Sequence, residues 1–367
     1  MSEDRFVEVP GGRRICYRVD GPDDGPPLLL IAGLGLDLTS WPRRMLDGFT
    51  GHGLRVIRLD NRDAGRSTRV QARPPSMLRQ LFARPVPGAY DLGDMAGDVD
   101  ALLEDLGTGP VHVLGMSMGG MIAQTLAARH PGRVATLTSV FSTTGDRKVG
   151  QPAPSTMLRM AKRPARTVEQ AVERHLSLLR HIGSAEFPPD DAEERAWVAG
   201  MWDRGSGRPN AAGVGRQIGA IQASGDRTAQ LRAITAPTLV IHGDADFMVH
   251  PSGGRATAAA IPGARHVEIP GMRHHFAPGV VDRVVALTTD HITTTAGAPS
   301  QPAGAAAGLA DRPAGGAAVA GVPARTADAG VAGGAVPDRT AGAGVAGGAA
   351  AAVAATVQDR AARSTST

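Results

Sequence analysis

The chain has 367 residues, with 39 basic and 35 acidic side chains and a formal net charge of +4. Its single cysteine, Cys16, excludes an intramolecular disulfide framework and a zinc site built from several thiolates. No apolar run approaches the ~20 residues of a membrane-spanning helix, and the charged N-terminus lacks the apolar core of an export signal. We therefore expect a cytoplasmic protein that binds neither membranes nor nucleic acid.

Short apolar runs recur along residues 1–295 and predict the strands of a sheet. Two runs near the N-terminus flank Pro10-Gly11-Gly12, which is typical of a hairpin. Further runs, apolar on both faces, follow at residues 28–32, 55–59, 111–114, 134–140 and 238–241. Amphipathic helical patterns separate several of them, for example at residues 92–106. This alternation predicts an α/β fold with a mostly parallel central sheet flanked by helices.

Between residues 141 and 230 the strand pattern disappears and helical patterns replace it. Thr167 and Gln170 form a candidate capping box, and Gly183 is the expected end of that helix. Asp190 or Asp191 is the candidate N-cap of a second helix. We interpret residues 141–230 as a helical lid inserted into a core made of residues 1–140 and 231–295. Such a lid would lie over the carboxyl ends of the strands, where open α/β sheets bind ligands.

The composition changes abruptly at residue 296. From there to residue 367, 40 of 72 residues are Ala or Gly and none is aromatic. Residues 323–336 are followed by a near copy at residues 337–350. Because such a segment buries too little apolar surface to offset the entropy of ordering it, we expect a low-complexity, disordered tail.

Residues 111–120 read Val-His-Val-Leu-Gly-Met-Ser-Met-Gly-Gly, an apolar strand that runs into a G-x-S-x-G turn. This pattern between a strand and a helix is typical of a nucleophile elbow, in which a strained turn raises the serine hydroxyl above the sheet. Gly115 and Gly119 would prevent collisions across that turn. The helix that follows would direct its N–H groups toward a developing oxyanion. Ser117 is therefore the candidate nucleophile.

With this motif the chain resembles the α/β-hydrolase superfamily over nearly all of residues 5–295. Residues 59–67, Leu-Asp-Asn-Arg-Asp-Ala-Gly-Arg-Ser, are similar to the family's D-x-R-G-x-G-x-S turn, with Asp63 where glycine is usual. Residues 32–35, Ala-Gly-Leu-Gly, resemble the family's H-G-x-G oxyanion loop, with Ala32 in place of the histidine. The resemblance implies an oxyanion hole made by the backbone N–H groups of Leu34 and Met118.

The resemblance also implies an acid that follows the nucleophile in the chain and precedes the histidine. After the apolar run at residues 238–241 the sequence reads His-Gly-Asp-Ala-Asp, similar to the family's G-x-x-D. Asp246 matches the acid by its spacing from the glycine. Asp244, a candidate turn residue, and Asp146, which follows an earlier strand, remain alternatives.

The histidine is expected in the segment Gly-Met-Arg-His-His-Phe at residues 271–276. Relatives usually read G-x-G-H, so His274 matches the catalytic position and Arg273 stands where glycine is common. His275 is the alternative. In the implied mechanism His274 takes the proton of Ser117, and Asp246 holds the imidazole in its useful tautomer.

These motifs resemble the subgroup that contains aclacinomycin methylesterase. The resemblance implies a serine hydrolase that cleaves a carboxylic ester, such as a methyl ester of a polyketide-like or other bulky hydrophobic molecule. Enol-lactone hydrolases, carbon–carbon bond hydrolases and cofactor-free haloperoxidase-type esterases share the Ser-Met-Gly-Gly motif and remain alternatives, as does a non-catalytic ligand receptor on the same fold. We expect no cofactor and no metal, because His242, His250 and their neighbouring aspartates fit ordinary loop chemistry. The expected partner is a small-molecule ester, and the oligomeric state is not predicted.

Overall fold

The computed structural model describes residues 2–76, 79, 80, 84, 86–160, 165–205 and 210–296. The chain divides into two units, residues 1–298 and 299–367, and every element described below belongs to the first. The tail predicted from residue 296 onward lies outside the described residues, except that Ala296 is the last residue of a helix.

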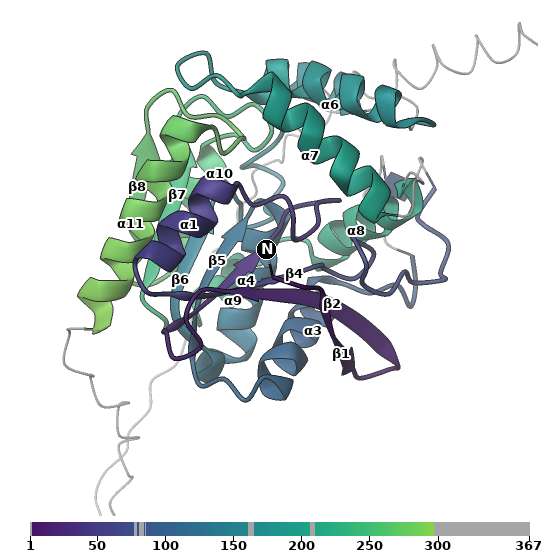
Figure 1. The fold of residues 1–367 in the computed structure, drawn as a ribbon. Helices are drawn as coiled ribbons and strands as arrows, with labels where there is room; N and C mark the ends of the chain where they lie inside the picture. Colours follow the sequence, from purple (N-terminus) through teal and green to yellow (C-terminus); the bar gives the residue numbers. More distant parts are fainter. Residues whose placement is uncertain are drawn as a thin grey trace, which may run out of the picture. The chain divides into compact units, whose positions relative to one another are not determined.

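An eight-stranded sheet forms the centre of the first unit (Figure 1). The strands are β1 (Arg5–Val9), β2 (Arg13–Asp20), β3 (Pro27–Ile31), β4 (Arg55–Leu59), β5 (Val111–Met116), β6 (Val134–Val140), β7 (Thr238–Gly243) and β8 (Arg265–Ile269). Their order is β1-β2-β4-β3-β5-β6-β7-β8, with β2 antiparallel to both neighbours and the other pairs parallel. The predicted α/β fold with a mostly parallel sheet is therefore confirmed.

Strand β8 is the one strand of the described chain that the sequence analysis did not predict. It forms the edge of the sheet and reads Arg-His-Val-Glu-Ile. Only Ile269 is fully buried, so the segment lacks the apolar run that marks the central strands.

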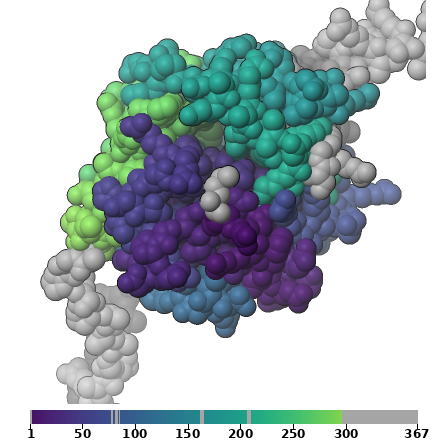
Figure 2. Space-filling view, viewed as in Figure 1, coloured from purple at the N-terminus to yellow at the C-terminus, as the bar shows by residue number. Residues whose placement is uncertain are grey.

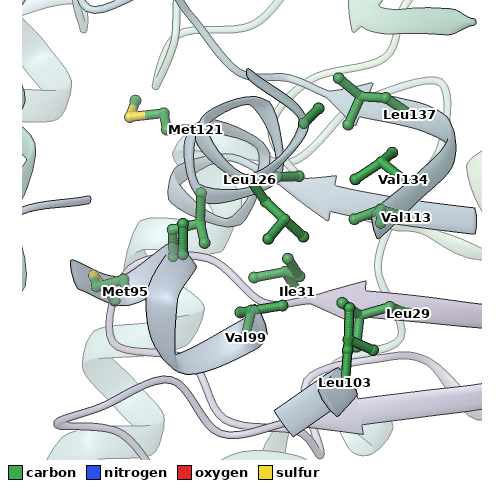
Figure 3. Packing of buried hydrophobic residues seen from close by; sticks show 14 of the residues in the cluster. Leu29, Ile31, Met95, Val99, Leu103, Val113, Met121, Leu126, Val134 and Leu137 are labelled. Carbon is green, nitrogen blue, oxygen red and sulfur yellow. The ribbon is translucent and has the colours of Figure 1, made fainter. Parts of the chain in front are cut away.

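Helices cover both faces of the sheet. Alternate side chains of β3 point to opposite faces, because successive residues of a strand alternate in direction. Leu28 and Leu30 pack with α1 (Arg43–Gly51) and α11 (Pro278–Ala296). Leu29 and Ile31 pack with α3 (Leu92–Asp105) and α4 (Met118–Arg129), as Figure 3 shows. Helix α10 (Ser252–Ala260) lies against β7.

Among the described residues, five helices lie in the chain between β6 and β7. They are α5 (Pro154–Met160), α6 (Val168–Ile182), α7 (Asp191–Arg204), α8 (Ala211–Ser224) and α9 (Thr228–Leu231). In Figure 1 α6 and α7 lie beyond one end of the sheet, and in Figure 2 their teal surface meets the purple and green surfaces of the N- and C-terminal segments. Val172, Leu176 and Val198 form a small core between α6 and α7.

The predicted ends of these helices are largely confirmed. The side chain of Thr167 accepts from the backbone N–H of Gln170 at 3.3 Å, and α6 ends before Gly183. The Gln170 side chain accepts from the backbone N–H of Arg166 instead, so the capping box is only half formed. Asp190 caps α7. No helix within the described residues is long and apolar enough to cross a membrane.

Candidate active site

Ser117 lies in the turn between β5 and α4, at the carboxyl edge of the sheet. Its backbone has φ 54° and ψ −121°, a conformation that L-residues rarely adopt. The flanking glycines permit it: a Cβ on Gly115 would lie 2.3 Å from the Gly119 oxygen, and one on Gly119 would lie 2.0 Å from the Ile31 oxygen. The local pattern therefore forms the strained strand-to-helix turn that the sequence predicts, with Ser117 partly exposed.

Two hydrogen bonds link Ser117, His274 and Asp246 in series, although both partners lie more than 100 positions after the serine in the chain. Nε2 of His274 lies 3.1 Å from the Ser117 hydroxyl, and Nδ1 of His274 lies 2.8 Å from Oδ2 of Asp246. The other carboxylate oxygen, Oδ1, accepts the N–H groups of Met248 at 2.7 Å and Val249 at 3.0 Å. Asp246 is thereby held with one oxygen directed at the imidazole.

The carboxyl group of Asp246 is buried but ionised. Burial alone would raise its pKa, but the opposing interactions with His274 and His242 lower the pKa below its ordinary value. An ionised carboxylate beside Nδ1 stabilises the tautomer of His274 in which Nδ1 carries a proton and Nε2 faces the serine.

The alternative acids have other partners. Asp244 accepts the backbone N–H of Gly271 at 2.8 Å, which ties two loops together. Asp146 accepts the N–H of Lys148 at 2.9 Å within its own turn. Of the three candidate acids, Asp246 is the one that forms a hydrogen bond with His274.

The other histidines considered above also have their own partners. Nε2 of His275 contacts Glu194 at 2.8 Å, Nε2 of His242 contacts the Val249 oxygen at 2.9 Å, and Nδ1 of His250 contacts the Ser252 hydroxyl at 2.9 Å. Across the described part of the chain, no group of three or more His, Cys, Asp or Glu side chains is placed to hold a metal ion.

The two candidate oxyanion donors flank the serine. Met118 is the first residue of α4, so its N–H has no acceptor inside the helix. Leu34 follows Gly33 in the loop after β3, and a Cβ on Gly33 would lie 3.4 Å from the Cβ of Ser117. The loop that carries Leu34 therefore runs directly beside Ser117.

Phe141 is a site residue that sequence reasoning missed. Its ring centroid lies 4.4 Å from that of His274, with the planes tilted by 47°. Its backbone φ of 36° is unusual for an aromatic residue, and the side chain is buried. The ring of Phe276 packs against the ring of Phe141, with centroids 4.9 Å apart. The sequence did offer one signal for Phe141: it directly follows the central strand β6, and the residues after such strands lie at the same edge of the sheet as Ser117.

Comparisons with known proteins agree with this geometry. Residues 26–277 match the family described as the alpha/beta hydrolase fold, and the chain belongs to that family. It is 33% identical over 268 residues to rhodomycin D methylesterase DnrP of Streptomyces peucetius, covering 66% of this chain and 83% of the relative. It is also 33% identical over 276 residues to rhodomycin D methylesterase DauP of Streptomyces sp. (strain C5), covering 68% of this chain and 85% of that relative. Among solved structures, the enol-lactonase from Burkholderia xenovorans LB400 superposes with a TM-score of 0.60 at 25% identity, covering 79% of this chain and 100% of that one.

Proposed function

We propose that this protein is a serine hydrolase that cleaves carboxylic esters through Ser117, His274 and Asp246. The observation that carries the proposal is the continuous chain of hydrogen bonds from Asp246 through the imidazole to the serine hydroxyl, 2.8 and 3.1 Å long. A serine that is oriented by a strained turn and contacted by an imidazole with an ionised carboxylate behind it is the arrangement that activates a nucleophile.

The reaction follows from these contacts. His274 takes the proton of Ser117 at Nε2 while the serine oxygen attacks the acyl carbon. The N–H groups of Leu34 and Met118 stabilise the negative charge that forms on the carbonyl oxygen. The imidazolium then gives its proton to the departing alcohol. In the second half of the reaction His274 takes a proton from a water molecule that attacks the acyl carbon, and returns it to the Ser117 oxygen as the acid leaves.

For the substrate we propose a methyl ester of a bulky hydrophobic, polyketide-like molecule. Two relatives at 33% identity, each matched over more than 80% of its length, are named rhodomycin D methylesterases. A second candidate is a lactone, because the enol-lactonase shares the fold at 25% identity. A lactone is a cyclic ester, so the same acyl step opens it, and the alcohol remains attached to the product.

We also propose the division into a core of residues 1–140 and 231–295, a lid of residues 141–230 and a tail of residues 296–367. The position of α5 to α9 between β6 and β7 supports the lid. The Ala- and Gly-rich composition supports the tail.

A fluorophosphonate probe tests the nucleophile. We expect covalent labelling of the wild-type chain, loss of labelling in Ser117→Ala, and a fall in ester hydrolysis of at least about 1,000-fold in that variant. Ser155→Ala is the matched control, because Ser155 also lies near an imidazole, 3.2 Å from Nε2 of His181. An unlabelled wild type, or labelling that survives Ser117→Ala, would refute the proposal.

A panel of aromatic polycyclic acids as methyl, ethyl and isopropyl esters, together with enol-lactones, tests the substrate. The proposal predicts the highest kcat/KM for the methyl esters of the largest acids. Faster turnover of the lactones would instead assign the second candidate.

A further inference from the structure

Gln217 of α8 is a fully buried glutamine whose side-chain amide spans two loops beside the nucleophile. Its Oε1 accepts the backbone N–H of Gly35 at 2.8 Å, and its Nε2 donates to the Arg62 oxygen at 2.9 Å. If the amide were turned round, its NH₂ group would face the Gly35 N–H and its oxygen would face the Arg62 oxygen. These partners therefore fix the orientation of the amide.

The contact with Gly35 controls the turn that contains Leu34. The Leu36 N–H donates to the Gly33 oxygen at 3.3 Å, which closes a four-residue turn with Gly35 at its third position and a φ of 71° there. The N–H held by Gln217 belongs to the peptide between Leu34 and Gly35. Holding that peptide restricts rotation about the backbone bonds of Leu34. It thereby restricts the direction of the Leu34 N–H, which belongs to the peptide before it.

The other side of the turn is held by a second amide. Nδ2 of Asn61 donates to the Ala32 oxygen at 3.0 Å, and Asn61 is buried. Ala32 has no polar side chain with which to brace the loop itself. The N–H of Leu34 therefore lies between two peptide groups that are each held by a buried carboxamide.

Helix α8 also packs directly against the turn. A Cβ on Gly35 would lie 2.9 Å from Cγ2 of Val214, one turn before Gln217 on the same helix. Contact through both a hydrogen bond and an apolar side chain means that a displacement of α8 would be transmitted to the turn.

We infer that Gln217 is a positioning residue that orients the Leu34 N–H toward the oxyanion, an inference that rests on the proposed function. It follows that α8, which lies between β6 and β7 in the chain, takes part in building the catalytic site. A residue 182 positions away from Gly35 thereby sets the geometry of an oxyanion donor.

Gln217→Met tests this inference, because methionine has a similar length and makes neither hydrogen bond. With a 4-nitrophenyl ester we expect kcat to fall about 10- to 100-fold, the range for a misplaced catalytic group, while KM changes by less than about threefold. Phenylboronic acid forms a tetrahedral adduct on the serine with an oxygen at the oxyanion position. Its inhibition constant should rise by the same factor as kcat/KM falls, an effect that general loosening of the fold would not produce.

Gln222→Met is the matched control on the same helix. Its Nε2 donates to the Gln80 oxygen at 2.7 Å, away from the turn, so kcat and boronate affinity should stay within about twofold of wild type. Thermal unfolding of each variant reports whether it is folded. A folded Gln217→Met variant with wild-type kcat and boronate affinity would overturn the inference.

Gln217→Glu separates the two contacts and serves if the methionine variant does not fold. A carboxylate oxygen still accepts the Gly35 N–H, but the donor to the Arg62 oxygen is lost. We expect kcat within about fivefold of wild type despite a lower Tm. A loss of kcat and boronate affinity of more than about tenfold in the folded Glu variant would overturn the inference. Failure of the proposed function itself is distinct, since wild type would then show neither esterase activity nor boronate inhibition.

Discussion

The guanidinium of Arg273 donates a hydrogen bond to the main-chain oxygen of Gly183, 3.0 Å away and 90 residues earlier in the chain. It also donates to the His181 oxygen at 3.3 Å, and the backbone N–H of His274 donates to the Ile182 oxygen at 3.1 Å. An ordinary helix end leaves its last carbonyl groups without partners. At the C-terminal end of α6, the loop that contains Arg273 and His274 donates hydrogen bonds to three successive carbonyl oxygens. Arg273 therefore holds this loop against the C-terminal end of α6.

Replacing Arg273 should therefore disturb the histidine loop. We expect Arg273→Gln to lower kcat about 3- to 10-fold through misorientation of His274, and to lower the free energy of unfolding by about 1 kcal/mol. Arg180→Gln is the control, because Arg180 is an exposed residue of α6 that pairs with Asp191 at 3.7 Å. Ester kinetics and urea unfolding of both variants provide the measurement; equal kinetics for Arg273→Gln and wild type would contradict the expectation.

Glu194 of α7 lies between two histidines, one of which is the neighbour of His274. Burial tends to raise its pKa, but hydrogen bonds with His175 at 2.6 Å and His275 at 2.8 Å lower the pKa to about 2. Since the pKa in the folded protein lies below the ordinary value of 4.5, this stabilisation is present above pH 4.5 and is lost as the pH falls toward 2.

Glu194→Gln should consequently be less stable than wild type at pH 6, by about 1–2 kcal/mol after allowance for partial exposure, with the difference shrinking below pH 4. Urea unfolding at pH 6, 4 and 3 measures this. The exposed Glu173, which pairs with Arg195 at 3.8 Å, supplies the control variant Glu173→Gln. A stability difference that stays constant from pH 6 to 3 would show that the carboxylate has no such role.

Asp63 has a φ of 66°, in the left-handed region that favours glycine. Its buried carboxylate takes two hydrogen bonds from Arg216, at 2.5 and 2.9 Å, and one from the Tyr90 hydroxyl at 2.8 Å. Asp63→Gly would relieve about 1 kcal/mol of backbone strain but leave the arginine without its partner, which costs about 3–5 kcal/mol.

The net expectation for Asp63→Gly is a loss of about 2–4 kcal/mol in the free energy of unfolding. Asp63→Asn should lose less, because asparagine tolerates positive φ and keeps one acceptor. Urea unfolding ranks the three proteins. A glycine variant as stable as wild type would mean that backbone strain outweighs the ion pair.

Arg204 at the end of α7 joins three buried carboxylates. Its Nη1 lies 2.7 Å from Asp60 and 3.0 Å from Asp37, and its Nη2 lies 3.2 Å from Asp4. Arg204→Met would leave these carboxylates without their shared cation, and we expect a loss of about 3–5 kcal/mol in unfolding free energy. Arg195→Met, on an exposed face of the same helix, should change stability by less than about 0.5 kcal/mol. Thermal unfolding of both variants measures the difference. Equal Tm values for Arg204→Met and Arg195→Met would contradict a stabilising role of Arg204.

Much of the fold could be predicted because its signals are local. The apolar runs of the central strands and the G-x-S-x-G turn each lie within about ten consecutive residues, so their spacing alone predicts backbone conformation. The positive φ of Ser117 is one such outcome. Strand β8 escaped prediction because an edge strand is only half covered and its residues are mostly polar.

The partners of several residues could not be predicted in this way. Gln217 and Asn61 resemble ordinary polar residues of a helix and a loop, and nothing beside them in the chain indicates that their amides meet the turn around Leu34. The same holds for Arg273, whose acceptors lie about 90 positions earlier.

The amino-acid sequence by itself determined the order of the central strands and the strained turn at Ser117, and its resemblance to a family supplied the candidates Asp246 and His274. Only the tertiary structure decided that these side chains meet, that Phe141 packs against the imidazole, and that α8 contacts the loop of Leu34 while the C-terminal end of α6 contacts the loop of His274. The physical reason is that backbone conformation depends on neighbouring residues, whereas a hydrogen bond between distant segments depends on how every intervening helix and strand packs.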